Sequence, residues 1–314
     1  MLGPPTITFV IPVYNGSATV GDVVKDIQEN FRGEDFEIVL VNDWSQDDSE
    51  STCRELRERY PGLITYVHLA HNFGEHAAVL AGLNHAQGDY VAVLDDDGQN
   101  PPREVRRLFE EIQKGSADVV YGRYRSKRHG RLRNLGSWFN DAMANAMLKK
   151  PRDLYLSSFK IMNRFLVDQI TKYKGPFPYI DGLILRTTSS IGQIEVEHVS
   201  RPTGKSGYTA KKLVSLWLNM FLNFSIAPLR AAVFLGLITS AFSILLLTGI
   251  VIDKIYINPN LTIGIPTVLV VQTLFAGVQL VVLGTIGEYL GRLFLDHSKR
   301  PQFVVRYCRE RSEP

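Results

Sequence analysis

The stretch Asp89–Pro102, DYVAVLDDDGQNPP, joins an apolar run to three consecutive carboxylates and two prolines. The run YVAVL is typical of a strand that is buried on both faces of a sheet. Asp95, Asp96 and Asp97 follow it, and adjacent carboxylates repel each other unless something positive binds them. Mg²⁺ and Mn²⁺ prefer carboxylate oxygen and commonly bring phosphate groups with them. The stretch predicts either a cation site at a strand end or a solvated acidic turn before a helix that begins at Pro101.

Four more apolar runs lie in the first part of the chain, and segments with helical spacing, such as residues 17–31 and 75–86, lie between the runs. The runs are TITFVIPVY (Thr6–Tyr14), FEIVLVND (Phe36–Asp43), LITYVHLA (Leu63–Ala70) and ADVVYGRY (Ala117–Tyr124). This alternation predicts an α/β, Rossmann-like, doubly wound fold with a mostly parallel sheet and right-handed crossovers. Two later runs, SSFKIMN and QIEVEHV, are expected to extend the sheet or to form a small flanking ribbon.

Polar residues gather where three of these strands end: Tyr14-Asn15, Asn42-Asp43 and the acidic triplet. Ligands of doubly wound sheets bind at the carboxyl ends of the strands. The three strand ends are therefore expected to face one crevice, which favours the cation site over the acidic turn.

The composition excludes some classes of protein. The 314 residues are 45% apolar and 21% charged with a net charge of +3, so neither a disordered chain nor a nucleic-acid-binding protein is expected. Cys53 and Cys308 lack metal-type spacing, and the first residues lack the positive region of a secretory signal. We expect free thiols in a reducing compartment. The basic stretch Arg123–Arg133 is either a solvated loop or a phosphate-collecting loop near the site or an anionic membrane face.

Two long uncharged segments in the last third of the chain, Ala231–Ile252 and about Pro266–Gly287, predict a helical hairpin through a bilayer. Two buried core helices are the alternative. Lys and Arg flank the hairpin on its outer sides, whereas the connector carries only Lys254. The positive-inside rule then predicts an inner-membrane protein with both termini and the α/β domain in the cytoplasm.

The segment KKLVSLWLNMFLNFSIAPLR before the hairpin has a narrow polar stripe, which is typical of a helix in the membrane interface, although a core helix fits too. Gly287 and Gly291 form a GxxxG pair, which is a weak indication of a helix–helix contact. The expected domains are a cytosolic domain at 1–208, an amphipathic helix at 209–229, a hairpin at 230–291 with spans at about 231–252 and 266–288, and a basic cytosolic tail at 292–314.

The motifs VIPVYN, VND followed by SQD, HNFGEHAAVLAGL and LDDDGQNPP resemble those of family 2 glycosyltransferases with the GT-A fold. EHVSRPTGKSGYTAKKL, the hairpin and GEYLGRLFLDHSKRPQFVV resemble the polyprenyl-phosphate glycosyltransferases, which include bactoprenol glucosyltransferases and formamido-arabinose transferases, and more distantly dolichol-phosphate mannosyltransferase. The resemblance implies inverting transfer of a sugar from a UDP-sugar to undecaprenyl or another polyprenyl phosphate. It also implies Mg²⁺ or Mn²⁺ as cofactor and a homo-oligomer, often a tetramer.

The resemblance also implies roles for individual residues. The nucleotide-binding positions are Pro12, Tyr14, Asn15, Asp43, Asp95 and Asp96, with Asp43 accepting from the uracil ring. Asp97 and Asp95 are implied as metal ligands, and Arg123, Arg201 and Lys205 as basic residues near the phosphates. Asp181 is a candidate for orienting the acceptor or serving as a base, or else a structural cap or turn residue.

The chain departs from the family pattern at several positions. Gly16 stands where Glu is frequent, and Asn42 and Trp44 replace the commoner Asp and Gly. Ser158 precedes Phe159 where some relatives carry an aspartate that is proposed as the base. A phosphate acceptor is already anionic at neutral pH, because its second pKa is about 6, so little proton remains for a base to remove.

Two other functions are alternatives to this one. A polysaccharide synthase is disfavoured, because there is no QxxRW signature and two spans are too few to enclose a channel. A membrane-tethered nucleotide-sugar-binding scaffold without turnover stays open, because of Gly16, Asn42 and Ser158. UDP release that depends on polyprenyl phosphate would separate the enzyme from the scaffold. The sugar and the pathway are not indicated by the sequence.

Overall fold

The computed structural model describes residues 5–124, 154–175, 178–197, 265–297 and 301–311, with a few single residues between 234 and 256. The chain divides into two compact units, Met1–Thr209 with Lys299–Pro314, and Ala210–Ser298. The strands of the first unit are β1 (Ile7–Val13), β2 (Phe36–Asn42), β3 (Ile64–Leu69), β4 (Tyr90–Val93), β5 (Val119–Tyr124), β6 (Lys160–Asn163), β7 (Ile191–Val196) and β8 (Val305–Arg309). Its helices are α1 (Val20–Asn30), α2 (Ser49–Arg59), α3 (Glu75–His85), α4 (Pro102–Ile112), α6 (Arg164–Ile170) and α7 (Ile180–Thr187).

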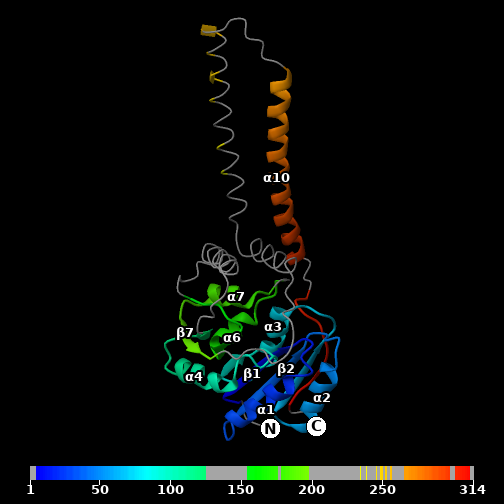
Figure 1. Cartoon of the computed structure of the whole chain (residues 1–314), viewed down its shortest axis with the longest axis vertical. Coiled ribbons are helices and arrows are strands. Elements are labelled where there is room, and N and C mark those ends of the chain that lie inside the picture. The colour runs from blue at the N-terminus through cyan, green and yellow to red at the C-terminus, as the bar shows by residue number, and fades with distance from the viewer. Residues whose placement is uncertain are drawn as a thin grey trace. The chain divides into compact units, whose positions relative to one another are not determined.

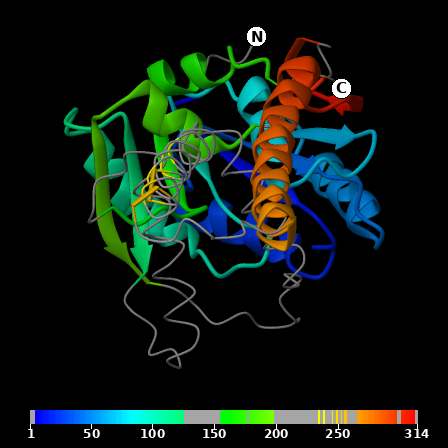
Figure 2. The ribbon, with the colours of Figure 1, turned by 90° about the horizontal axis from the view of Figure 1, so that it is seen from above.

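The strands form one eight-stranded sheet in the order β7-β5-β6-β4-β1-β2-β3-β8. The central strands β4, β1, β2 and β3 are mutually parallel, and β5 is parallel to β7. β6 is antiparallel to both of its neighbours, and β8 is antiparallel to β3. This sheet confirms the predicted mostly parallel α/β architecture. Figure 2 shows β7 and β8 at opposite edges of the sheet.

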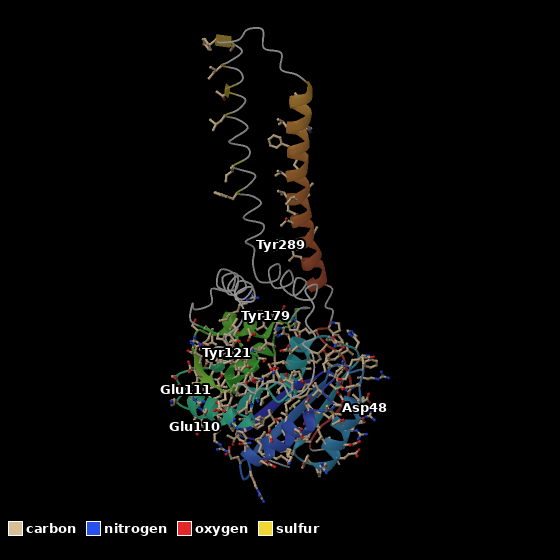
Figure 3. The ribbon with its side chains drawn as sticks, in the orientation of Figure 1. Asp48, Glu110, Glu111, Tyr121, Tyr179 and Tyr289 are labelled. Carbon is tan, nitrogen blue, oxygen red and sulfur yellow. The ribbon has the colours of Figure 1, made fainter. Side chains whose placement is uncertain are left out.

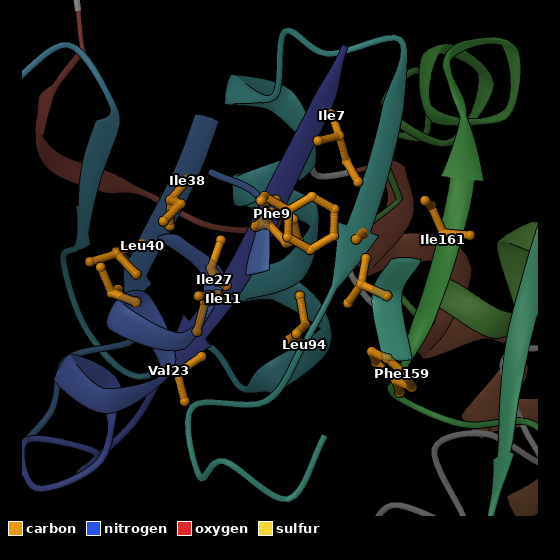
Figure 4. Close-up of a cluster of buried hydrophobic side chains, with 14 of the residues drawn as sticks. Ile7, Phe9, Ile11, Val23, Ile27, Ile38, Leu40, Leu94, Phe159 and Ile161 are labelled. Atoms are coloured by element: carbon orange, nitrogen blue, oxygen red, sulfur yellow. The ribbon is translucent and has the colours of Figure 1, made fainter. Parts of the chain in front are cut away.

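Side chains of the strands alternate between two hydrophobic cores, one on each face of the sheet. Ile7, Phe9 and Ile11 of β1 point into the core that α1, α2 and α4 cover, and Figure 4 shows Phe9 at its centre. Val10 of β1 lies in the opposite core, which α3, α6 and α7 cover. Figure 1 shows the two helix groups on the two sides of the sheet. Strands that are buried on both faces explain the continuous apolar runs in the sequence.

Each run that was predicted as a strand contains one, and the runs SSFKIMN and QIEVEHV supply β6 and β7 of the same sheet. The position of β6, inserted antiparallel between β4 and β5, was not anticipated. Helical crossovers favour parallel neighbours, and no local signal shows that a later segment will separate β4 from β5.

The C-terminal segment differs from the basic tail that was expected at 292–314. Its residues 305–309 form β8, which pairs with β3, Val67 lying opposite Cys308. β8 is short and carries Arg306 and Arg309, and both features are typical of an edge strand. The same features in the sequence cannot be distinguished from those of a charged tail. Cys53 and Cys308 are both free, as expected.

The second unit contains α10 (Ile265–His297), a helix of 33 residues that includes the second predicted span. Among the residues that the structure describes, no helix combines the length and the hydropathy that crossing a membrane requires. The predicted interface helix at 209–229 and most of the first predicted span lie outside the described residues. The membrane hairpin therefore stays a prediction.

Candidate active site

The carboxyl ends of β4, β1 and β2 meet at one edge of the sheet, as the sequence predicts. The backbone N–H of Tyr14 donates to Oδ2 of Asp96 over 3.1 Å. The backbone N–H of Asp43 donates to the carbonyl oxygen of Val13 over 2.9 Å. These two bonds tie the three strand ends together. The side chain of Tyr14 is 47% exposed, so its ring is accessible to a flat ligand.

The loops after β1 and β2 are joined by reciprocal hydrogen bonds. The N–H of Asn15 donates to Oγ of Ser45 over 3.0 Å, and Oδ1 of Asn15 accepts from the N–H of Gln46 over 2.8 Å. Asn15 has a φ of 56°, in the left-handed region that Asn tolerates better than most residues. Asn15 therefore shapes the loop itself. Pro12 lies within β1, opposite Val41 of β2.

Asp43 holds the loop directly before α3. Its Oδ1 accepts from the N–H of Phe73 over 2.7 Å, and its Oδ2 accepts from the N–H of Gly74 over 2.8 Å. Burial raises the pKa of the Asp43 carboxyl above its ordinary value, although these two N–H bonds act to lower it. The resemblance implies a contact of Asp43 with the uracil ring, and these two loop contacts are additional to it. Each carboxylate oxygen still has a second lone pair, so they do not exclude a ligand contact.

Asp95 is held by one side chain from its own loop and one from the segment before β6. Its Oδ2 accepts from Oγ of Ser158 over 2.7 Å and from Nδ2 of Asn100 over 2.9 Å. Its Oδ1 accepts no hydrogen bond from the part of the chain that the structure describes. Burial, together with the charge of Glu75, raises the pKa of Asp95 to about 6. Asp95 is thus held through one of its two carboxylate oxygens.

The pairing of β6 explains why Ser158 lies beside Asp95. β6 is antiparallel to β4 with Lys160 opposite Val93, so the same register continues to Ser158 opposite Asp95. Residues two apart on a strand face the same side of a sheet, so Ser158 lies on the face where Lys160 meets α7. No pattern in the sequence indicates this contact, because it depends on the insertion of β6 beside β4.

Of the three basic residues expected near the phosphates, Arg123 alone is described. It lies on β5 and is exposed. Lys160 pairs with Tyr121, so the continuing register places Arg123 opposite Ser158, in the row of the acidic triplet. Arg201 and Lys205 lie outside the described residues.

Asp181 lies in the first turn of α7 and forms a buried ion pair with Nζ of Lys160. Its Oδ1 also accepts from the hydroxyl of Tyr121 over 2.9 Å. Burial, with the nearby Asp181 charge, raises the pKa of Tyr121 above its ordinary value. Figure 3 labels Tyr121 and also Tyr179, which precedes α7 and meets the ring of His76 at 4.9 Å. The ion pair favours a structural role for Asp181 over that of a base, which must reach the acceptor.

Asp97 completes the acidic triplet. It is almost buried, and its Oδ1 accepts from the N–H of Gln99 over 3.1 Å. No group of three or more His, Cys, Asp or Glu side chains able to hold a metal occurs among the described residues. Mg²⁺ nevertheless binds through one or two carboxylates where substrate phosphates complete its shell. Asp95 and Asp97 supply carboxylate oxygens of the kind that such a cation prefers.

An aromatic cluster beside this edge was missed by the sequence analysis. Trp44 directly follows Asp43 and has a φ of 57°, which is unusual for a bulky residue. The guanidinium of Arg306 on β8 lies 5.3 Å from the centroid of the Trp44 ring, and the His68 ring lies 5.6 Å from it. The contact depends on β8, which the sequence does not distinguish from a tail.

Comparison with known proteins identifies relatives along the whole chain. The model of glycosyl transferase family 2 matches residues 8–171. The undecaprenyl-phosphate 4-deoxy-4-formamido-L-arabinose transferase of Edwardsiella ictaluri (strain 93-146) is 30% identical, over 98% of this chain and 95% of that protein. The bactoprenol glucosyl transferase of Shigella phage SfX is also 30% identical, over 96% of this chain and 98% of its own.

A solved structure supports the fold. Glucosyl-3-phosphoglycerate synthase from Mycobacterium tuberculosis, in complex with Mn²⁺, UDP and phosphoglyceric acid, superimposes with a TM-score of 0.50. The similarity covers 69% of this chain and 78% of that one at 22% identity. At this identity the likeness concerns the fold alone.

Proposed function

Because the chain belongs to glycosyl transferase family 2 and is a glycosyltransferase, we propose that it transfers a sugar from a UDP-sugar to undecaprenyl phosphate with inversion. The relative from Edwardsiella is named for transfer to undecaprenyl phosphate, and the relative from phage SfX for bactoprenol glucosyl transfer. Both matches extend over nearly the full length of this chain and of the relative. This supports a polyprenyl phosphate as acceptor.

The observation that carries the proposal for the donor is the joining of three strand ends at one edge. The N–H of Tyr14 is bonded to Asp96, so the exposed ring of Tyr14 and the acidic triplet lie within the reach of one nucleotide. Such a ring can stack on a nucleobase. A divalent cation at Asp95 and Asp97 would neutralise the charge that develops on departing UDP. The residues proposed to hold the nucleotide are joined by a hydrogen bond of their own, which would reduce the cost of ordering them on binding.

The acceptor needs positioning more than it needs a base. A phosphate oxygen of the lipid would form a bond to the anomeric carbon while the bond from that carbon to the UDP oxygen breaks. A single displacement of this kind inverts the anomeric centre. The nucleophile is already anionic, because the second pKa of a phosphate monoester is about 6. Arg123, with Arg201 and Lys205, would hold the phosphate for attack, which agrees with Ser158 in place of a carboxylate.

A lipid acceptor also fits the composition of the last third of the chain. The uncharged segments near 231–252 and 266–288 and the flanking Lys and Arg support membrane attachment with the sheet domain on the cytoplasmic side. A homo-oligomer is part of the same proposal, by resemblance to the family.

The test is a direct assay of the lipid product. The purified full-length protein is incubated with undecaprenyl phosphate, Mg²⁺ or Mn²⁺ and a panel of UDP-sugars, and the lipid is analysed by mass spectrometry. One UDP-sugar should yield a monoglycosylated lipid phosphate, and EDTA should abolish it. Asp97→Asn should reduce turnover by at least about 100-fold, whereas Asp22→Asn, at an exposed position of α1, should not. Undiminished turnover in Asp97→Asn would refute the assignment of the acidic triplet.

A further inference from the structure

The segment before β6 carries two serines that take part in one hydrogen-bonded network with the acidic triplet. Oγ of Ser157 donates to the hydroxyl of Tyr124 over 3.2 Å, and that hydroxyl donates to Oδ1 of Asn100 over 2.7 Å. Nδ2 of Asn100 then donates to Oδ2 of Asp95 over 2.9 Å. Ser158 donates to the same oxygen over 2.7 Å. Every donor in this series of hydrogen bonds points toward the Asp95 carboxylate, and hydrogen bonds in such a series strengthen one another.

We propose that Ser158 is a positioning residue, whose hydroxyl fixes the Asp95 carboxylate so that its other oxygen faces the nucleotide and its cation. The inference rests on the proposed function, because it assumes that the triplet binds a nucleoside diphosphate. Ser158 occupies the position at which some relatives carry an aspartate that is proposed as the base, and the inference gives the serine a different role. Ser158 acts through Asp95 and does not itself touch the reacting atoms.

The neighbouring carboxylates show why such a donor is needed. Each member of the triplet accepts a hydrogen bond from a different donor. Asp96 accepts from the N–H of Tyr14, Asp97 from the N–H of Gln99 in the same loop, and Asp95 from Ser158 and Asn100. Three adjacent carboxylates repel each other, so without such donors they would turn away from one another. A hydroxyl supplies the donor for Asp95 without adding a charge.

An aspartate at position 158 would have the opposite effect. Its carboxylate would lie within about hydrogen-bonding distance of Asp95, because the backbone register fixes the two positions opposite each other. Two ionised carboxylates so close repel each other, and a carboxylate cannot donate the hydrogen bond that Ser158 supplies. A serine therefore suits a site in which donors hold the Asp95 carboxylate and the acceptor brings its own negative charge.

The experiment compares Ser158→Ala, Ser158→Thr and Ser158→Asp with the wild type and with Ser51→Ala in full-length protein. Ser51 is an exposed serine on α2 whose hydroxyl donates to the carbonyl oxygen of Asp48, remote from the triplet in the sequence. Mn²⁺ binding is followed by electron paramagnetic resonance with UDP present, and UDP binding by calorimetry with Mn²⁺ present. Circular dichroism checks that each variant is folded. Steady-state kinetics then separate KM for the donor from kcat.

Ser158→Ala should weaken Mn²⁺ and UDP binding by about 10- to 100-fold, as the loss of a group that orients a metal ligand usually does. Ser158→Thr retains the hydroxyl and should bind within about threefold of the wild type, as should Ser51→Ala. Ser158→Asp should bind and turn over no better than Ser158→Ala. If Ser158→Ala failed to fold, the comparison of Thr with Asp would still decide the question.

Two outcomes overturn the inference. One is unchanged Mn²⁺ and UDP binding in folded Ser158→Ala. The other is higher turnover in Ser158→Asp than in the wild type, which would identify the position as the site of a base. Failure of the proposed function is distinguishable from both, because a wild type that binds UDP and Mn²⁺ but transfers no sugar still permits the binding comparison.

Discussion

Nζ of Lys160 and Oδ1 of Asp181 form an ion pair in which the two side chains are only 4% and 10% exposed. Lys160 is the first residue of β6, and Asp181 lies in the first turn of α7. The pair therefore connects the sheet to the helical layer on the face that also carries Asp95 and Ser158. A buried pair is stabilising only while both charges are present, because each alone would lack a counter-charge in a site with little water.

Removing one partner should destabilise the protein strongly. Lys160→Met leaves the Asp181 charge buried and should lower the free energy of unfolding by about 3–5 kcal/mol. Asp181→Leu should have a similar effect. The midpoint of denaturant unfolding, followed by circular dichroism, measures both.

The double variant Lys160→Met/Asp181→Leu is the matched control. It leaves neither charge unpaired and should be more stable than either single variant, which gives a large coupling energy in the cycle. Single variants with the unfolding midpoint of the wild type would show that this pair does not hold β6 against α7.

A second buried ion pair holds the segment that follows β8 against β2. Nε of Arg311 lies 3.1 Å from Oε2 of Glu37, a fully buried carboxylate that also accepts from Thr8. Arg311→Met should lower the free energy of unfolding by about 3–5 kcal/mol, because it leaves Glu37 charged and unpaired. Arg309→Met serves as control, since its pair with Glu58 is exposed and about 0–1 kcal/mol is expected there. Equal midpoints for the two variants would contradict the proposed fastening of β8.

Gly16 is required by the position of Asp96. A Cβ at residue 16 would lie 2.2 Å from Oδ2 of Asp96, the atom that accepts from the N–H of Tyr14. Gly16→Ala should displace this carboxylate and weaken UDP binding by about tenfold, the value of one hydrogen bond to a charged group. Calorimetry with UDP measures the effect. Gly21→Ala is the control and should leave UDP binding unchanged, because a Cβ at residue 21 meets nothing within 4 Å. If Gly16→Ala bound UDP as tightly as Gly21→Ala, the Asp96 side chain would have room to move aside and the prediction would be wrong.

The stability of the protein should depend on the charge of His76. Burial lowers the pKa of His76 from 6.5 to about 4. Between these values the unfolded chain binds a proton that the folded protein does not, so stability falls as the pH falls from about 6.5 toward 4. His76→Phe keeps an aromatic ring against Tyr179 and removes the proton site. Its melting temperature should therefore fall less steeply over this range than that of the wild type, and parallel curves for the two proteins would contradict the prediction.

Much of the fold could be predicted because the sheet is buried on both faces. Continuous apolar runs mark such strands without any knowledge of their partners, and the polar residues at their ends were expected to meet. The bond from Tyr14 to Asp96 confirms that expectation for two of the three ends. The hydrogen bonds of Asp43 to the loop before α3 were not anticipated, because a carboxylate after a strand suggests a ligand and a loop contact equally well.

The sequence by itself determined the alternating elements and the edge where the acidic triplet stands, because apolar runs, helical spacing and the polar residues that follow a strand are local properties of the chain. The tertiary structure alone decided which segments lie beside that edge. In the folded protein β6 lies next to β4, which brings Ser158 to Asp95 and Lys160 to Asp181. The C-terminal strand β8 pairs with β3 at the opposite edge of the sheet. These contacts join residues far apart in the chain, and their energies depend on how the whole sheet is ordered, for which no local pattern exists.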